Sequence, residues 1–91
     1  MSPPALEAVV RRSPLYLLRW EPTQDAHVLL YPEGVVKLSP TAAAILERCD
    51  GSTVRALLKS LADEFPDDDI APDVLEFLEV ARDRGWIHAD P

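Results

Sequence analysis

Apolar and polar positions alternate through the first part of the chain in three short runs, at residues 15–21, 27–31 and 35–38. Alternation of this kind is typical of half-buried strands. Turn sequences rich in proline, aspartate and glycine separate the runs, at residues 22–25 and 31–34. The pattern predicts a three-stranded antiparallel meander whose third strand is an edge, with one row of unpaired backbone groups.

After the third run the apolar positions recur every three or four residues, which predicts three amphipathic helices. We expect them over residues 40–50, from about 53 to 65, and 71–84. The start and stop signals are Ser39-Pro40 and Asp50-Gly51 for the first helix, Ser52 or Thr53 and Pro66 for the second, and Ala71-Pro72 and Gly85 for the third.

The third helix carries an apolar stripe that is wider than a single core contact requires in so short a chain. Two interpretations stay open: the whole stripe is core, or its margin lines a groove beside the third strand. Its polar face consists of Asp73, Glu76, Glu79 and Asp83. Trp86-Ile87, just beyond this helix, is expected to pack back onto the sheet or the helices.

These elements predict an α+β fold in which a three-stranded antiparallel meander is followed by a three-helix bundle. Residues 14–91 are expected to form one domain. Residues 1–13 contain two prolines and are expected to be a poorly ordered, flexible N-terminal arm, with docking onto a partner or a second subunit as the alternative.

The charge of the chain disfavours a nucleic-acid partner. The net charge is -7, and the first forty residues are neutral, so the whole acidic excess lies in the predicted helical half. Nucleic-acid affinity rests on lysine and arginine neutralising phosphates. No apolar run reaches the ~20 residues of a membrane span, and the N-terminus lacks the order of a signal peptide, so we expect a cytoplasmic protein.

No residue pattern indicates an enzyme, a metal site or a cofactor site. There is no glycine-rich phosphate loop and no supported Ser/His/Asp or Cys/His arrangement, and His27 and His88 are expected to be surface or half-buried residues. The run 67–69 of three aspartates is interpreted as a solvated loop rather than a calcium site. Cys49, the single cysteine, lies on the apolar stripe of the first helix and is expected to be a packed thiol.

A sheet edge beside an amphipathic helix is the arrangement that captures an extended peptide by strand addition. The peptide would bond main chain to main chain along residues 35–38, with alternate side chains entering the groove between strand and helix. Proline removes an N–H, so Val36→Pro is the first test, and Val35 or Lys37 takes its place if the Val36 N–H faces the second strand.

With these elements in place, the chain resembles the PqqD family, the small peptide chaperones of pyrroloquinoline quinone biosynthesis. The resemblance covers about residues 14–87 and rests on LRW, VLLYPEGVVKLSPTAAAIL, CDG, TVRALLKSLADEFP and an apolar third helix ending at Gly85-Trp86-Ile87. Where the family often has Leu-Asn before its first helix, this chain has Leu38-Ser39, and the segment before Pro14 has no counterpart.

The resemblance implies a winged-helix-like fold that binds the ribosomal precursor peptide PqqA. The chain would present this peptide to PqqE, a radical S-adenosylmethionine enzyme that cross-links glutamate and tyrosine side chains. It also implies that the peptide lies between the third strand and the third helix. The implied peptide-binding residues are Val35, Val36, Lys37 and Leu38 on the strand, with Leu75, Leu78 and Arg82 on the helix.

Two alternatives from other classes stay open. The first is a winged-helix nucleic-acid-binding protein, against which the acidic third helix argues. The second is a carrier of the finished quinone, for which the two tryptophans would offer stacking surface. A monomer is expected in dilute solution, and a domain-swapped dimer is the alternative because an exposed edge strand and the short hinge at 22–25 favour exchange.

Overall fold

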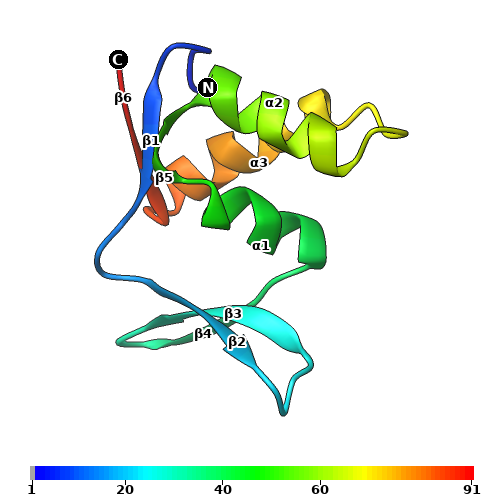
Figure 1. Ribbon diagram of the computed structural model, residues 1–91. Coiled ribbons are helices and arrows are strands. Elements are labelled where there is room, and N and C mark those ends of the chain that lie inside the picture. Colours follow the sequence, from blue (N-terminus) through cyan, green and yellow to red (C-terminus); the bar gives the residue numbers. More distant parts are fainter. Residues whose placement is uncertain (1) are drawn as a thin grey trace.

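Two three-stranded antiparallel sheets lie against three helices in residues 2–91, the part of the chain that the computed structural model describes (Figure 1). One sheet has the order β2-β3-β4 and the other the order β5-β1-β6. The strands are β1 (Val9–Arg12), β2 (Leu17–Glu21), β3 (Ala26–Tyr31), β4 (Gly34–Lys37), β5 (Asp50–Thr53) and β6 (Ile87–Asp90), and the helices are α1 (Pro40–Glu47), α2 (Val54–Glu64) and α3 (Ala71–Asp83).

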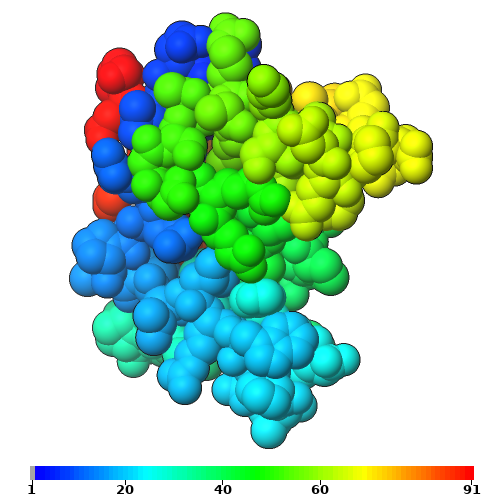
Figure 2. All heavy atoms as spheres, viewed as in Figure 1, coloured from blue at the N-terminus to red at the C-terminus, as the bar shows by residue number. Residues whose placement is uncertain are grey.

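The β2-β3-β4 sheet is the meander that the alternating pattern predicts. Leu18, Leu29 and Val36 pair across its three strands and share one face. This inner face packs on the helices, since Leu29 belongs to the main hydrophobic cluster and Leu18 and Val36 pack against it. Figure 2 shows the two hairpins, blue to cyan, forming the end of the molecule below the green helices. The predicted α+β class, with a meander followed by three helices, is confirmed.

The β5-β1-β6 sheet differs from the sequence prediction, because its central strand comes from the expected arm. Residues 9–12 pair with residues 50–53 on one side and with residues 87–90 on the other. Val10 is fully buried, and the Ser13 N–H donates to the Trp86 carbonyl at 2.9 Å. Because both partner strands are far away in the sequence, no local pattern around residues 9–12 reveals the strand.

Helix α1 begins where predicted and ends earlier than predicted. The Ser39 hydroxyl accepts a hydrogen bond from the Ala42 N–H at 3.1 Å, as expected of an N-terminal cap. At the other end the Arg12 guanidinium donates to the carbonyls of Leu46, at 2.6 Å, and Glu47, at 3.2 Å. The prediction that residues 50–51 stop this helix is wrong, because the helix ends at Glu47 and these two residues begin β5, in which Asp50 pairs with Arg11 of β1.

Helices α2 and α3 follow the predicted signals closely. Thr53 caps α2, since its hydroxyl accepts from the Ala56 N–H at 3.1 Å. Beyond α3, Gly85 has a φ of 77°, a left-handed conformation that glycine adopts without a Cβ penalty. The chain then returns as β6 with Ile87 buried, which confirms that this segment packs back. No helix in residues 2–91 is both long and apolar enough to cross a membrane.

Candidate functional site

The free edge of β4 is the first candidate for a functional site. Among residues 2–91, β4 pairs with β3 only, so its other side presents unpaired backbone groups to solvent. Each strand of the meander is short, and β4 has four residues. A second extended chain could continue this sheet.

The register decides which amides face outward. The Leu38 N–H donates to the His27 carbonyl at 2.9 Å, so residues 27 and 38 form a hydrogen-bonded pair. Bonded and non-bonded pairs alternate in an antiparallel ladder, so Leu29 and Val36 are also bonded and Val28 and Lys37 are not. The backbone groups of Val36 therefore face β3. Val35 and Lys37 direct theirs to the open edge.

Side chains on β4 divide between the two faces of the sheet. Val36 and Leu38 point inward, where Leu38 is buried and Val36 is half-buried against the same core. Val35 and Lys37 point to the outer face and are exposed. A strand added at this edge would thus meet apolar core on one side and exposed side chains on the other.

The three helix residues implied by the resemblance differ in their surroundings. Leu75 is half-buried, packed against the hydrophobic cluster to which Leu38 also belongs. Leu78 has no exposed surface and serves as core, so nothing can contact it without a rearrangement of its neighbours. The Arg82 guanidinium is bonded to the Ser2 carbonyl, an engagement that no sequence pattern predicts.

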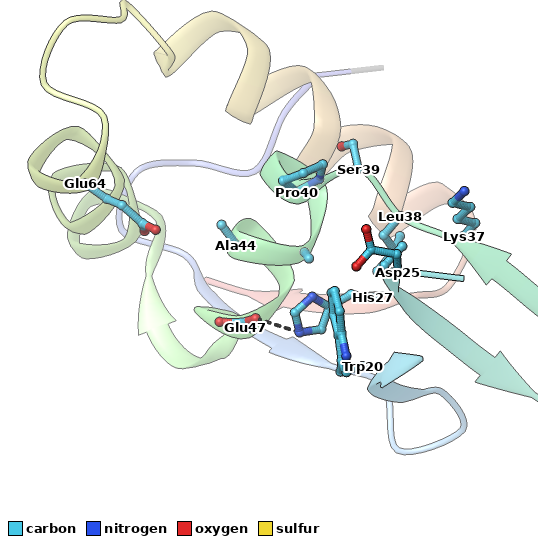
Figure 3. Close-up of a pocket in the computed structure, with 12 residues that line it drawn as sticks. Trp20, Asp25, His27, Lys37, Leu38, Ser39, Pro40, Ala44, Glu47 and Glu64 are labelled. Carbon is cyan, nitrogen blue, oxygen red and sulfur yellow. Dashed lines mark ion pairs between the residues drawn. The ribbon is translucent and has the colours of Figure 1, made fainter. Parts of the chain in front are cut away.

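A cavity of about 760 Å³ opens between the meander and α1 (Figure 3). On its lining the His27 Nε2 lies 3.3 Å from the Glu47 Oε1, and the ring of Trp20 lies edge-on to His27 with centroids 5.2 Å apart. Figure 3 shows Glu64 of α2 and Lys37 of β4 on opposite sides. The sequence did not predict this cavity, because its lining brings Leu38 and Pro40 together with the small residues Ala43 and Ala44, which read only as part of an apolar helix face.

Titratable groups that can do chemistry do not converge in the described structure. Burial raises the pKa of the Cys49 thiol from its ordinary value of 9.0 to about 12, and its S–H donates to the Ile45 carbonyl at 3.3 Å. This agrees with the predicted packed thiol. His88 is exposed and lies on β6, away from His27 on β3. Within residues 2–91 no group of three or more His, Cys, Asp or Glu could hold a metal ion.

The two alternative functions find little support in the geometry. Asp73, Glu76 and Asp83 are exposed on α3, so the helix that would face a nucleic acid presents carboxylates. The tryptophans do not form a common stacking surface. Trp20 contacts His27, whereas Trp86 packs against Phe77 with ring centroids 6.2 Å apart.

Comparison with known proteins identifies the family. The family described as "Coenzyme PQQ synthesis protein D (PqqD)" matches residues 26–87, which include β3, β4 and all three helices. The chain belongs to the PqqD family. The solution NMR structure of the PqqD truncation of Methylobacterium extorquens PqqCD, described as a functional and stand-alone RiPP recognition element, has a TM-score of 0.72, 29% identity and 88% coverage of each chain.

Curated members of the PqqD family show higher sequence similarity. The PqqA binding protein of Azotobacter vinelandii is 55% identical over 74 residues, covering 79% of this chain and 80% of its own. That of Methylococcus capsulatus is 43% identical, covering 89% and 88%. That of Pseudomonas aeruginosa is 45% identical over 89 residues, covering 96% and 97%, so the similarity extends over β1 as well.

Proposed function

We propose that this chain is a non-catalytic peptide chaperone of pyrroloquinoline quinone biosynthesis. It binds the precursor peptide PqqA by strand addition to β4 and presents it to the radical S-adenosylmethionine enzyme PqqE. The observation that carries the proposal is the open edge of β4, where Val35 and Lys37 direct backbone groups away from the sheet. The names of the curated relatives support PqqA as the peptide.

The backbone of Val35 and Lys37 offers two N–H donors and two carbonyl acceptors to the peptide. These bonds supply affinity without regard to peptide sequence, whereas alternate side chains supply selectivity. Peptide side chains on the inner side meet Val36, Leu38 and Leu75. Leu78 supports them from the core, and Arg82 exchanges the Ser2 carbonyl for the peptide.

A residue-by-residue titration tests the proposal. Isotope-labelled protein is titrated with PqqA while amide chemical shifts are followed, and shifts concentrated in residues 34–39 and 72–84 are expected. The same titration is repeated with PqqE present. Absence of shifts in these two segments under both conditions, at several-fold excess of peptide, would reject peptide binding at this edge.

Presentation to the enzyme has its own test. PqqE is expected to cross-link PqqA faster when the chain is added, because the peptide then arrives ordered and held. The Val35→Pro variant serves as control, since it lacks one outward donor. Equal rates with and without the wild-type chain would contradict presentation while leaving peptide binding intact.

A further inference from the structure

The outer face of the β2-β3-β4 sheet is unusually apolar for a face turned to solvent. Leu17, Leu30 and Val35 form one cross-strand row on it, because Leu17 pairs with Leu30 and Leu30 with Val35. Leu17 is 57% exposed and Val35 58% exposed. Leu15, just before β2, is 72% exposed. In an antiparallel sheet with one buried face, the other face normally carries polar side chains.

This row is separate from the core that holds the fold together. Leu18, Leu29 and Val36 point to the helices, so the outer residues add nothing to that packing. Isolated exposed apolar residues are ordinary, but several in one row mark a contact surface. The fold alone therefore gives no reason for leucine at position 17.

A basic row lies beside the apolar row. Arg19 and Lys37 flank Val28 in the neighbouring cross-strand row of the same face, and Val28 itself is buried, so only the two basic side chains of this row are exposed. In residues 2–91 neither cation forms an ion pair. Glu21, an acid on the same face, accepts a hydrogen bond from the Thr23 hydroxyl at 3.0 Å within its own turn. The outer face is thus apolar and positive in a chain whose net charge is -7.

The partner that fits is apolar where it meets Leu17 and acidic where it meets Arg19 and Lys37. A second copy of the chain does offer such a spot on α3, where Asp73 and Glu76 lie beside Phe77 and Val80. A contact between that spot and the outer face is head-to-tail, and it makes open chains of subunits unless its rotation closes. A protein other than a second copy can offer the same apolar and acidic contacts without forming open chains of subunits.

The outer face is also continuous with the peptide-binding edge. Val35 belongs to the apolar row and also directs its backbone groups to the open edge. A peptide strand added there would place every second side chain in line with the two outer rows. A partner seated on the outer face would therefore touch the bound peptide.

We propose that the outer face of the β2-β3-β4 sheet is a docking surface for the enzyme that modifies the bound peptide. The enzyme contributes a contact area that is apolar at its centre and acidic at its rim. This inference rests on the proposed function and adds the surface by which the partner is held. Leu17 and Val35 supply the exposed apolar contact, and Arg19 and Lys37 supply the charge.

The test uses the full chain, with PqqE as the probe. Leu17→Ser and Arg19→Glu are each expected to weaken PqqE binding by about ten-fold or more, as removal of an apolar anchor or reversal of a charge at a contact does. Matched controls are Leu6→Ser, before β1, and Lys59→Glu on α2, both exposed and outside the β2-β3-β4 sheet. The controls are expected to bind PqqE within about two-fold of wild type.

Affinity for PqqA separates this inference from the proposed function. Leu17 and Arg19 lie on β2, so both variants should bind PqqA like wild type. PqqE affinity that is unchanged in both variants overturns the docking surface. Self-association of the wild type that Leu17→Ser abolishes also overturns it, because the occupant is then a second copy. Failure of the wild type to bind PqqA contradicts the proposed function instead.

Discussion

Val35 and Val36 are neighbours of the same type, yet their backbone groups point in opposite directions. The bond from the Leu38 N–H to the His27 carbonyl sets this alternation. Val36 bonds β3 and holds the sheet together, whereas Val35 is free to bond another chain. A substitution at one position tests stability, and the same substitution at the other tests binding.

Val35→Pro is expected to weaken PqqA binding by about ten-fold or more, because it removes one outward N–H and hinders the approach of a strand. Val35→Thr is the matched control, since it keeps the N–H and the β-branched shape and should bind within about three-fold of wild type. Isothermal titration of both variants measures this. Equal affinities for the two variants would rule out backbone pairing at Val35.

Cys49 gives a prediction about pH. Burial raises the pKa of its thiol to about 12, so between pH 9 and that value the unfolded chain releases a proton that the folded chain retains. The free energy of unfolding should therefore fall with rising pH, by up to about 1.4 kcal/mol per pH unit from this group. Urea unfolding of wild type and Cys49→Ala measures the difference in slope. Parallel pH dependences would contradict a retained proton.

At the scale of elements, α1 is fastened at both ends by side chains. Ser39 caps its start from the preceding residue, and Arg12 of β1 bonds the last carbonyls from a distant part of the sequence. Cations are favourable at a helix C-terminus because the carbonyls there carry partial negative charge. Arg12 thus connects β1, the central strand of the β5-β1-β6 sheet, to the helix that covers the meander.

Arg12→Ala is expected to destabilise the fold by about 1 to 2 kcal/mol, because the carbonyls of Leu46 and Glu47 lose their charged donor. Arg11→Ala is the matched control, since Arg11 is exposed and should change stability by less than about 0.5 kcal/mol. Urea unfolding followed by circular dichroism compares them. A smaller loss for Arg12→Ala than for Arg11→Ala would refute the role of this contact.

At the scale of the whole molecule, the helices pack against two sheets that have different roles, the meander below α1 and the β5-β1-β6 sheet at one side (Figure 1). The β2-β3-β4 sheet carries the open edge and the outer apolar row, while the β5-β1-β6 sheet ties both ends of the described chain together. β1 is the central strand of the second sheet. The expected monomer is not tested by this arrangement and remains a prediction for sedimentation analysis.

Removal of residues 1–13 is expected to unfold or strongly destabilise the chain, because it deletes β1 and uncovers Ile87. A chain that begins at Ala5 is the control, since it retains β1 and its pairings. Thermal unfolding and amide chemical-shift dispersion compare the two. If the truncated chain keeps the dispersed spectrum and the thermal midpoint of the control, residues 1–13 act as a flexible arm and β1 is not needed for the fold.

The meander, the three helices and two of their caps follow from the sequence because each depends on residues close together. Alternation marks β2, β3 and β4, and Ser39 and Thr53 cap the helices that they precede. The edge of β4 follows from strand order alone. Membership of the PqqD family is also readable, since its ordered motifs lie within the matched residues 26–87.

Tertiary structure alone decided the second sheet, the end of α1 and the details of the site. β1 is four residues with two arginines, and it is a strand only because residues 50–53 and 87–90 pair with it. The outward direction of Val35, the burial of Leu78 and the cavity beside α1 depend in the same way on contacts between distant segments. Local pattern reports which face a residue prefers, whereas register and packing determine what that face meets.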